Sequence, residues 1–169
     1  NDCVVGFDAP LIVRNATGQR PAERAINADF ARFQAGTHPS NTGKPEFADG
    51  TRAAQLAEAL DLDIDARSGS SRRALEVYPH AATVALFRLG RTLKYKSKPG
   101  RGLAQMRTEL QRLMELIESL AGADPALRSG NCQDWARLRE AAESASRKSD
   151  LRRVEDPVDA VVCAYVAMF

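Results

Sequence analysis

The sequence predicts a domain of the α/β class. Two short runs rich in apolar residues, at 3–7 and 73–77, have the length and composition of strands, and a proline follows each of them closely. Helical patterns separate and follow these runs, and the clearest lies at 102–121. The chain has 169 residues, 44% hydrophobic and 27% charged, an ordinary balance for one globular domain. We therefore expect a single domain over residues 1–169.

The first third of the chain predicts one strand, two helices and a long loop. Residues 3–7 are a continuous apolar run, which predicts a buried, central strand that ends at Pro10. A helix is expected over 21–33, because proline suits a first turn and apolar residues then recur at helical spacing. Residues 36–50 are rich in Gly, Pro, Ser and Asn, and loops of this length often carry function. A second helix is expected over 51–60.

The rest of the chain is mainly helical. The strand at 73–77 precedes an expected helix at 79–89, and further helices are expected at 133–146 and from Pro157 onward. Two strands do not make a stable independent sheet, so we expect weaker strands or sequence outside this chain to complete it. The chain begins without Met and ends inside an apolar helical pattern. We therefore expect a portion of a longer gene product, partial at both ends.

The helix expected at 102–121 has a short heptad seam. Its apolar residues recur at alternating spacings of three and four, and they are Leu103, Met106, Leu110, Leu113, Ile117 and Leu120. The seam is shorter than the roughly three or four heptads that argue for a coiled coil. An amphipathic helix packed inside the domain explains it, and a helix that forms a homodimer is the alternative.

Charge and cysteine content exclude several classes of protein. The net charge is only +2, so nucleic-acid binding would need a local basic patch. The three cysteines lie far apart without a CxxC pair, which excludes zinc ribbons and thioredoxin-like motifs. We expect reduced thiols in a cytoplasmic protein. No apolar stretch reaches the length of a membrane span, and we expect no signal peptide.

Carboxylates at the ends of apolar runs are the main clue to function. Asp8 directly follows the first strand, where functional residues of α/β folds lie, although an aspartate there also caps turns. Glu76 lies within the second strand and is equally explained as a solvent-facing residue. Asp159 and Asp156 sit near Pro157, and Asp156 is a natural N-cap. The small residues Ala160, Cys163, Ala164 and Ala167 follow at helical spacing, so this helix can approach the sheet closely.

A basic segment at 88–101 is the second clue. It has no acid, and its cations are Arg88, Arg91, Lys94, Lys96, Lys98 and Arg101. Tyr95 lies among them, and cations with an interleaved aromatic suit a phosphate backbone with a stacked base. A solvated basic loop is the alternative explanation. His80 lies close to Glu76 and could serve as a general base or orient a ligand, whereas His38 in the long loop is a weaker candidate.

One aspartate-rich stretch imitates a calcium loop. Residues 61–65 alternate Asp with apolar residues, as the start of an EF-hand loop does. Ala66 stands where that loop needs glycine, and Arg72 stands where it needs glutamate. The stretch is therefore not an EF-hand. No Walker loop, GxGxxG fingerprint or serine triad order is present either.

Taken together, the motifs resemble the family named domain of unknown function 429. They are the run GFDAPL, then EVYPH, then YK followed by Gly-Arg and a long helix, and finally DPVDAVVCAYVA. The resemblance spans Gly6 to Ala167, and the last motif is its most specific part. Members of that family look like predicted nucleases with a ribonuclease-H-like fold. The resemblance thus implies a mixed sheet flanked by helices, with N-terminal strands ahead of this chain.

The resemblance also implies a metal site. The presumed catalytic residues and metal ligands of the family fall on Asp8, Glu76 and Asp159, with His80 and Asp156 close enough to orient them. The family also has an aspartate on an earlier strand, which this chain lacks. The implied cofactor is Mg²⁺ or Mn²⁺, the hard cations that carboxylates bind.

Two functions follow as expectations. The first is a metal-dependent nuclease, in which Lys96, Lys98, Arg101 and Tyr95 bind the nucleic acid. The second is a non-catalytic binding or interaction module on the same fold, dimeric through the helix at 102–121.

Overall fold

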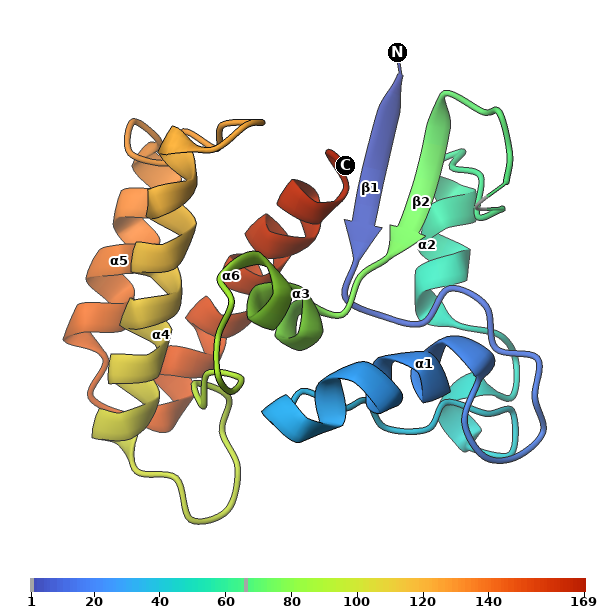
Figure 1. The fold of residues 1–169 in the computed structure, drawn as a ribbon, viewed down its shortest axis with the longest axis horizontal. Coiled ribbons are helices and arrows are strands. Elements are labelled where there is room, and N and C mark those ends of the chain that lie inside the picture. The colour runs from blue at the N-terminus through green and yellow to red at the C-terminus, as the bar shows by residue number, and fades with distance from the viewer. Residues whose placement is uncertain (1, 66) are drawn as a thin grey trace. The chain divides into compact units, whose positions relative to one another are not determined.

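The computed structural model describes residues 2–65 and 67–169, and this part of the chain contains two strands and six α-helices (Figure 1). In chain order they are β1 (Cys3–Phe7), α1 (Pro21–Phe30), α2 (Arg52–Ala59), β2 (Arg72–Glu76), α3 (Pro79–Leu86), α4 (Leu103–Ser119), α5 (Gln133–Ser144) and α6 (Lys148–Val166). The α/β class expected from the sequence is confirmed. The chain divides into two compact units, one formed by residues 1–92 with 163–169 and the other by residues 93–162.

β1 and β2 form a two-stranded parallel sheet (Figure 1). In its register Phe7 pairs with Glu76. Asp63 extends the sheet beyond β2, since its amide donates to Arg72 and its carbonyl accepts from Ala74. All five residues of β1 are half-buried, so β1 is not the buried strand that its composition predicted. In the described residues β1 has a neighbouring strand on one side only, and a mixed sheet is not observed there. The parallel pairing brings the carboxyl ends of both strands to one edge.

The ends of several helices differ from the sequence-based bounds by a few residues. α1 ends at Phe30, and its last predicted turn is the 3₁₀ turn Ala31–Phe33. α3 ends at Leu86 rather than at Leu89, and α5 ends at Ser144. The long loop at 36–50 contains one 3₁₀ turn, Pro45–Phe47. Helix ends are set by capping and packing as well as by periodicity, which explains these shifts.

One side of the sheet carries the core of the first unit. Its buried members are Leu11, Ala53, Ala57, Leu62 and Ala74. α2 supplies two of them, and it is tied to the strand region at its start: the Thr51 hydroxyl accepts a hydrogen bond from the Ala54 amide and donates one to the Leu11 carbonyl. A threonine N-cap of this kind satisfies a helix amide that would otherwise lack a partner.

The carboxyl-terminal end of α6 approaches β1 at backbone distance. A Cβ atom on Gly6 would lie 2.4 Å from the carbonyl oxygen of Cys163, closer than real atoms pack. Only glycine fits at this position. The predicted close approach is therefore observed, but it depends on Gly6 and Cys163. Ala160 and Ala164, which were expected to share the contact, are exposed.

α4 and α5 pack against each other in the second unit (Figure 1). The central seam residues Met106, Leu110, Leu113 and Ile117 are all buried within the chain. Trp135 of α5 is buried too, and its indole N–H donates to the Glu118 carboxylate at 2.8 Å. The central part of the seam therefore belongs to a helix packing within the chain, and formation of a homodimer stays a prediction.

α6 begins nine residues earlier than predicted, at Lys148, and contains Pro157 in its interior. Its start is capped by Asp150, which accepts the amides of Ser146 at 3.1 Å and Arg147 at 2.8 Å. Proline removes one helical hydrogen bond, and here the helix continues through it. Asp156 is consequently an exposed residue of the helix interior and not its N-cap. No helix in the described part of the chain is long and apolar enough to cross a membrane.

Candidate functional site

Asp8 and Glu76 lie together at the carboxyl edge of the sheet. Asp8 directly follows β1, Glu76 is the last residue of β2, and the in-register pairing of Phe7 with Glu76 makes the two acids neighbours along this edge. Both line one cavity of about 200 Å³. The carboxyl edge of parallel strands is where α/β proteins place their ligands. The structure therefore brings together two of the site residues that the sequence predicted.

Arg20 holds the carboxylate of Glu76. Nη2 of Arg20 lies 2.6 Å from Oε1 of Glu76, and Nη1 lies 2.7 Å from Oε2. The Leu11 amide donates a third hydrogen bond to Oε2 at 3.0 Å. The hydrogen bonds to Glu76 raise the pKa of Arg20 above its ordinary value, against the opposing effect of burial. This two-point pairing fixes the orientation of the Glu76 carboxylate in the cavity.

Glu23 is the second carboxylate on Arg20. It is buried, accepts the Arg20 Nε–H at 2.8 Å, and accepts the Ser40 amide at 3.1 Å. Burial by itself raises the pKa of Glu23, but these hydrogen bonds outweigh burial and leave the pKa below its ordinary value. Sequence reasoning missed both Arg20 and Glu23. The available signal was their spacing of three around Pro21, which is that of a capping box.

Both histidines belong to this region. His38 lines the same cavity as Asp8 and Glu76. The His80 ring packs edge-on against Tyr78, which also lines the cavity, and its Nδ1 lies 3.1 Å from the Thr92 hydroxyl. The structure thus brings the histidine of the long loop to the cavity itself, whereas sequence reasoning gave preference to His80.

Asp159 is buried in the second unit with two partners from the basic segment. Its exposed fraction is 1%, its Oδ1 accepts the Tyr95 hydroxyl at 2.6 Å, and its Oδ2 lies 2.6 Å from Nζ of Lys96. Burial raises the pKa of Asp159, while Lys96 and Tyr95 oppose that shift. Tyr95 is itself only 1% exposed. Its ring therefore offers no face for a stacked base here, and its hydroxyl serves to position Asp159.

Glu155 is a further buried acid that sequence reasoning missed. It precedes Asp159 by four residues, one helical turn, and is 6% exposed. Burial raises its pKa, Lys96 lowers it, and the neighbouring charges of Asp156 and Asp159 raise it again. Lys96 is thus the cation that acts on both buried carboxylates. Asp156 is exposed on the same helix.

Lys98 and Arg101, the other two cations predicted to bind phosphate, differ in their exposure to solvent. Lys98 is exposed, as a residue that contacts nucleic acid would be. Arg101 is half-buried, and its Nη1 donates to the carbonyl of Lys96 at 2.7 Å. Arg152 of α6 joins this neighbourhood through a hydrogen bond of 3.4 Å to the Ser97 hydroxyl.

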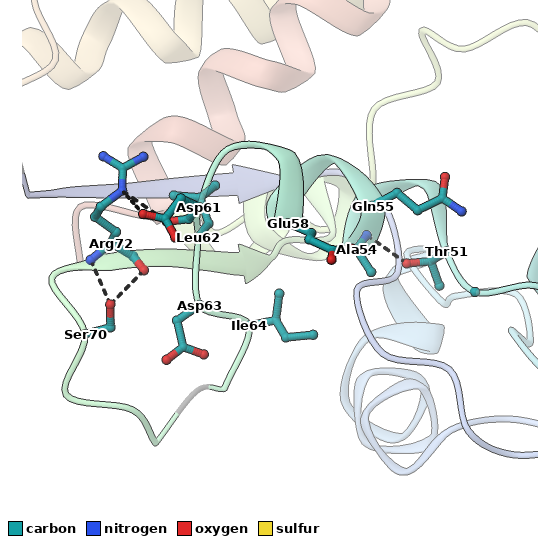
Figure 2. Close-up of a pocket in the computed structure, with 11 residues that line it drawn as sticks. Thr51, Ala54, Gln55, Glu58, Asp61, Leu62, Asp63, Ile64, Ser70 and Arg72 are labelled. Carbon is teal, nitrogen blue, oxygen red and sulfur yellow. Dashed lines mark hydrogen bonds and ion pairs between the residues drawn. The ribbon is translucent and has the colours of Figure 1, made fainter.

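A wider recess of about 640 Å³ lies between α2 and the start of β2, and Figure 2 shows the side chains that line it. Arg72 is the residue of this lining that holds the end of α2. Arg72 donates to the carbonyls of Leu60 at 2.6 Å and Asp61 at 3.0 Å, where α2 ends. Asp63 accepts the Asp65 amide at 2.8 Å. The carboxylate of Asp63 thus has a hydrogen-bond partner within the stretch itself.

Across residues 2–65 and 67–169, no three side chains of His, Cys, Asp or Glu converge as metal ligands. Asp8 and Glu76 share a cavity in the first unit, and Asp159 belongs to the second. Comparison with curated proteins finds no match, and comparison with solved structures finds none either. A family profile described as "Protein of unknown function (DUF429)" matches residues 1–169. The chain therefore belongs to the DUF429 family, as its motifs indicated, along its whole length.

Proposed function

We propose that this chain is a divalent-metal-dependent phosphodiester hydrolase of ribonuclease-H-like type. One observation carries the proposal: Asp8 and Glu76 end two paired parallel strands and line a single cavity. Carboxylates at this edge are suited to a hard cation and a phosphate group. Mg²⁺ or Mn²⁺ is the proposed ion.

The donor chemistry fits such an ion. Mg²⁺ is usually held by one or two carboxylates, with waters and substrate phosphates as its remaining ligands, so it does not need a complete protein cage. Asp8 and Glu76 supply two carboxylates in one cavity. Arg20 is the competing cation, because it occupies both oxygens of Glu76. Binding of an ion at Glu76 would therefore share or displace the Arg20 contact.

The surrounding residues have separate roles in this proposal. A bound divalent ion would activate water and stabilise the leaving oxygen. Arg20 orients Glu76, and Tyr95 with Lys96 holds Asp159 in one orientation. Lys98 and Arg101 would bind backbone phosphates, which makes nucleic acid the proposed substrate.

Calorimetric titration with Mn²⁺ tests the metal site. Wild-type protein should bind saturably, and Asp8→Asn should remove that binding. Asp29→Asn is the matched control, because Asp29 is an exposed acid of α1 away from the cavity lining. Hydrolysis of labelled single-stranded and duplex DNA and RNA then tests the reaction, where Asp8→Asn should lower the rate about 100-fold or more. Full activity in Asp8→Asn would refute the proposal.

A non-catalytic binding module is the second candidate, and the hydrogen bonds that the Glu76 carboxylate already accepts favour it. Three donors from Arg20 and Leu11 engage Glu76, as they would in a purely structural ion pair. In that case Glu76→Gln lowers the melting temperature, and neither this variant nor the wild type shows Mn²⁺ binding. A metal site instead predicts that Glu76→Gln weakens Mn²⁺ binding as well.

A further inference from the structure

The long loop at 36–50 is fastened to α1 on both sides of His38. On one side, the Thr37 amide donates to Oδ1 of Asn27 at 2.6 Å, and the Asn27 amide group donates back to the Thr37 carbonyl at 3.2 Å. On the other side, the Ser40 amide donates to both carboxylate oxygens of Glu23, each at 3.1 Å. These bonds fix the backbone around His38 and so fix where its side chain can reach.

The backbone on both sides of His38 is therefore anchored, and the imidazole lines the cavity from this anchored segment. Its side chain is exposed and lines the cavity that Asp8 and Glu76 share. Among the described residues, no hydrogen bond or ion pair of the His38 ring is found. An exposed histidine carried at a cavity by an anchored backbone is arranged for contact with a ligand.

We propose that His38 is the proton-transfer residue of the Asp8–Glu76 cavity, an inference that rests on the proposed hydrolase function. Its neutral imidazole would accept a proton from the attacking water while the water oxygen bonds to phosphorus. The opposite P–O bond breaks, and its electron pair leaves with the ester oxygen, which takes a proton from solvent. Histidine suits this role because its ordinary range of titration lies near neutral pH.

The charged and titratable groups around His38 are known from the cavity lining. They are Asp8 after β1, Glu76 at the end of β2, Arg20 and Glu23 at the start of α1, and Tyr78. Arg20 supplies one positive charge against the two negative charges of Glu23 and Glu76, so it offsets half of their charge through its ion pairs. Asp8 is the third acid of the lining, and it lies on the same cavity as His38.

Enzyme kinetics can distinguish proton transfer by His38 from a purely structural role. His38→Ala should lower kcat by about 100-fold or more, the usual size of a general-base effect, with Mn²⁺ affinity unchanged within about 2-fold. The limb of the pH–rate profile on which activity rises with pH should disappear. Free imidazole in the buffer should restore part of the lost rate. His38→Gln repeats the comparison with a side chain of similar size that cannot transfer the proton, in case His38→Ala folds poorly.

The outcomes separate this inference from the function on which it rests. A His38 variant with the wild-type kcat and pH profile would overturn the role of His38 and leave the hydrolase intact. A rate loss without imidazole rescue and with an unchanged pH profile would also overturn it, because it would indicate only a structural effect. If wild-type protein binds Mn²⁺ but cleaves no phosphodiester, the hydrolase proposal fails, and the His38 inference fails with it.

Discussion

Arg20 and Glu76 are 56 residues apart in the chain and are joined by two parallel hydrogen bonds of 2.6 and 2.7 Å. Arg20 ends the segment before α1, and Glu76 ends β2. The pair connects the helix layer to the carboxyl edge of the sheet. It also decides how Glu76 is presented to the cavity. The chemistry proposed for this edge and the stability of the first unit consequently depend on the same contact.

Replacement of Arg20 is expected to destabilise the protein strongly. Arg20→Met leaves Glu23 buried without its cation and Glu76 without its two-point partner, and loss of one member of a buried ion pair costs about 3 kcal/mol or more. Urea unfolding measures the change in the free energy of unfolding. Arg24→Met is the control, because Arg24 is an exposed arginine of α1 whose guanidinium donates to the Gln19 carbonyl at 2.8 Å. A similar small effect of both variants would contradict the structural role of Arg20.

Glu23 predicts a loss of stability in acid. Hydrogen bonds hold its pKa below the ordinary value of 4.5, so the folded state favours the ionised form. Its contribution is therefore complete above pH 4.5 and is lost as the pH falls through the lowered folded-state pKa. Urea unfolding at a series of pH values from 7 to about 3 should show this decline. The decline should be shallower in Glu23→Gln, and equal slopes in both proteins would argue against the Glu23 network.

Glu155 predicts a pH dependence of stability that is opposite in sign to that of Glu23. Burial raises its pKa above 4.5, so its favourable contribution is present below its unfolded-state pKa and is lost as the pH rises through the folded-state pKa. At neutral pH, Glu155→Gln should stabilise the protein by about 1 kcal/mol, because one buried charge is removed and Lys96 then serves Asp159 alone. Thermal unfolding at pH 7 measures this. Glu140→Gln on the exposed surface of α5 should have little effect.

Gly6 is expected to tolerate no side chain. In Gly6→Ala the new methyl group would meet the Cys163 carbonyl at 2.4 Å, and a helix backbone cannot yield as a flexible side chain does. Overpacking of this kind costs about 1–3 kcal/mol. Gly69→Ala is the matched control, since nothing lies within 4 Å of its added methyl group. Equal melting temperatures for the two variants would show that the contact at Gly6 is not close.

Local patterns in the sequence were sufficient for much of the secondary structure. β1 was predicted residue for residue, and α4 within a residue or two, because an unbroken apolar run and a heptad-spaced seam are local signals. The position of Asp8 just after a strand followed from the same reasoning. The start of α6 did not, because Pro157 was taken as the helix start and the Asp150 cap seven residues earlier was overlooked.

Contacts between residues far apart in the sequence determined which elements pack together and which residues share the candidate site. Sequence alone identified Asp8 and Glu76 as candidates, but only the parallel register of β1 and β2 placed them on one cavity. The Arg20–Glu76 pair, the Tyr95–Asp159 hydrogen bond and the presence of His38 in the cavity join segments dozens of residues apart. Periodicity reports which face of an element is buried, but it carries no information on which other element covers that face. That choice depends on packing and charge pairing across the whole fold, so it becomes visible only in the tertiary structure.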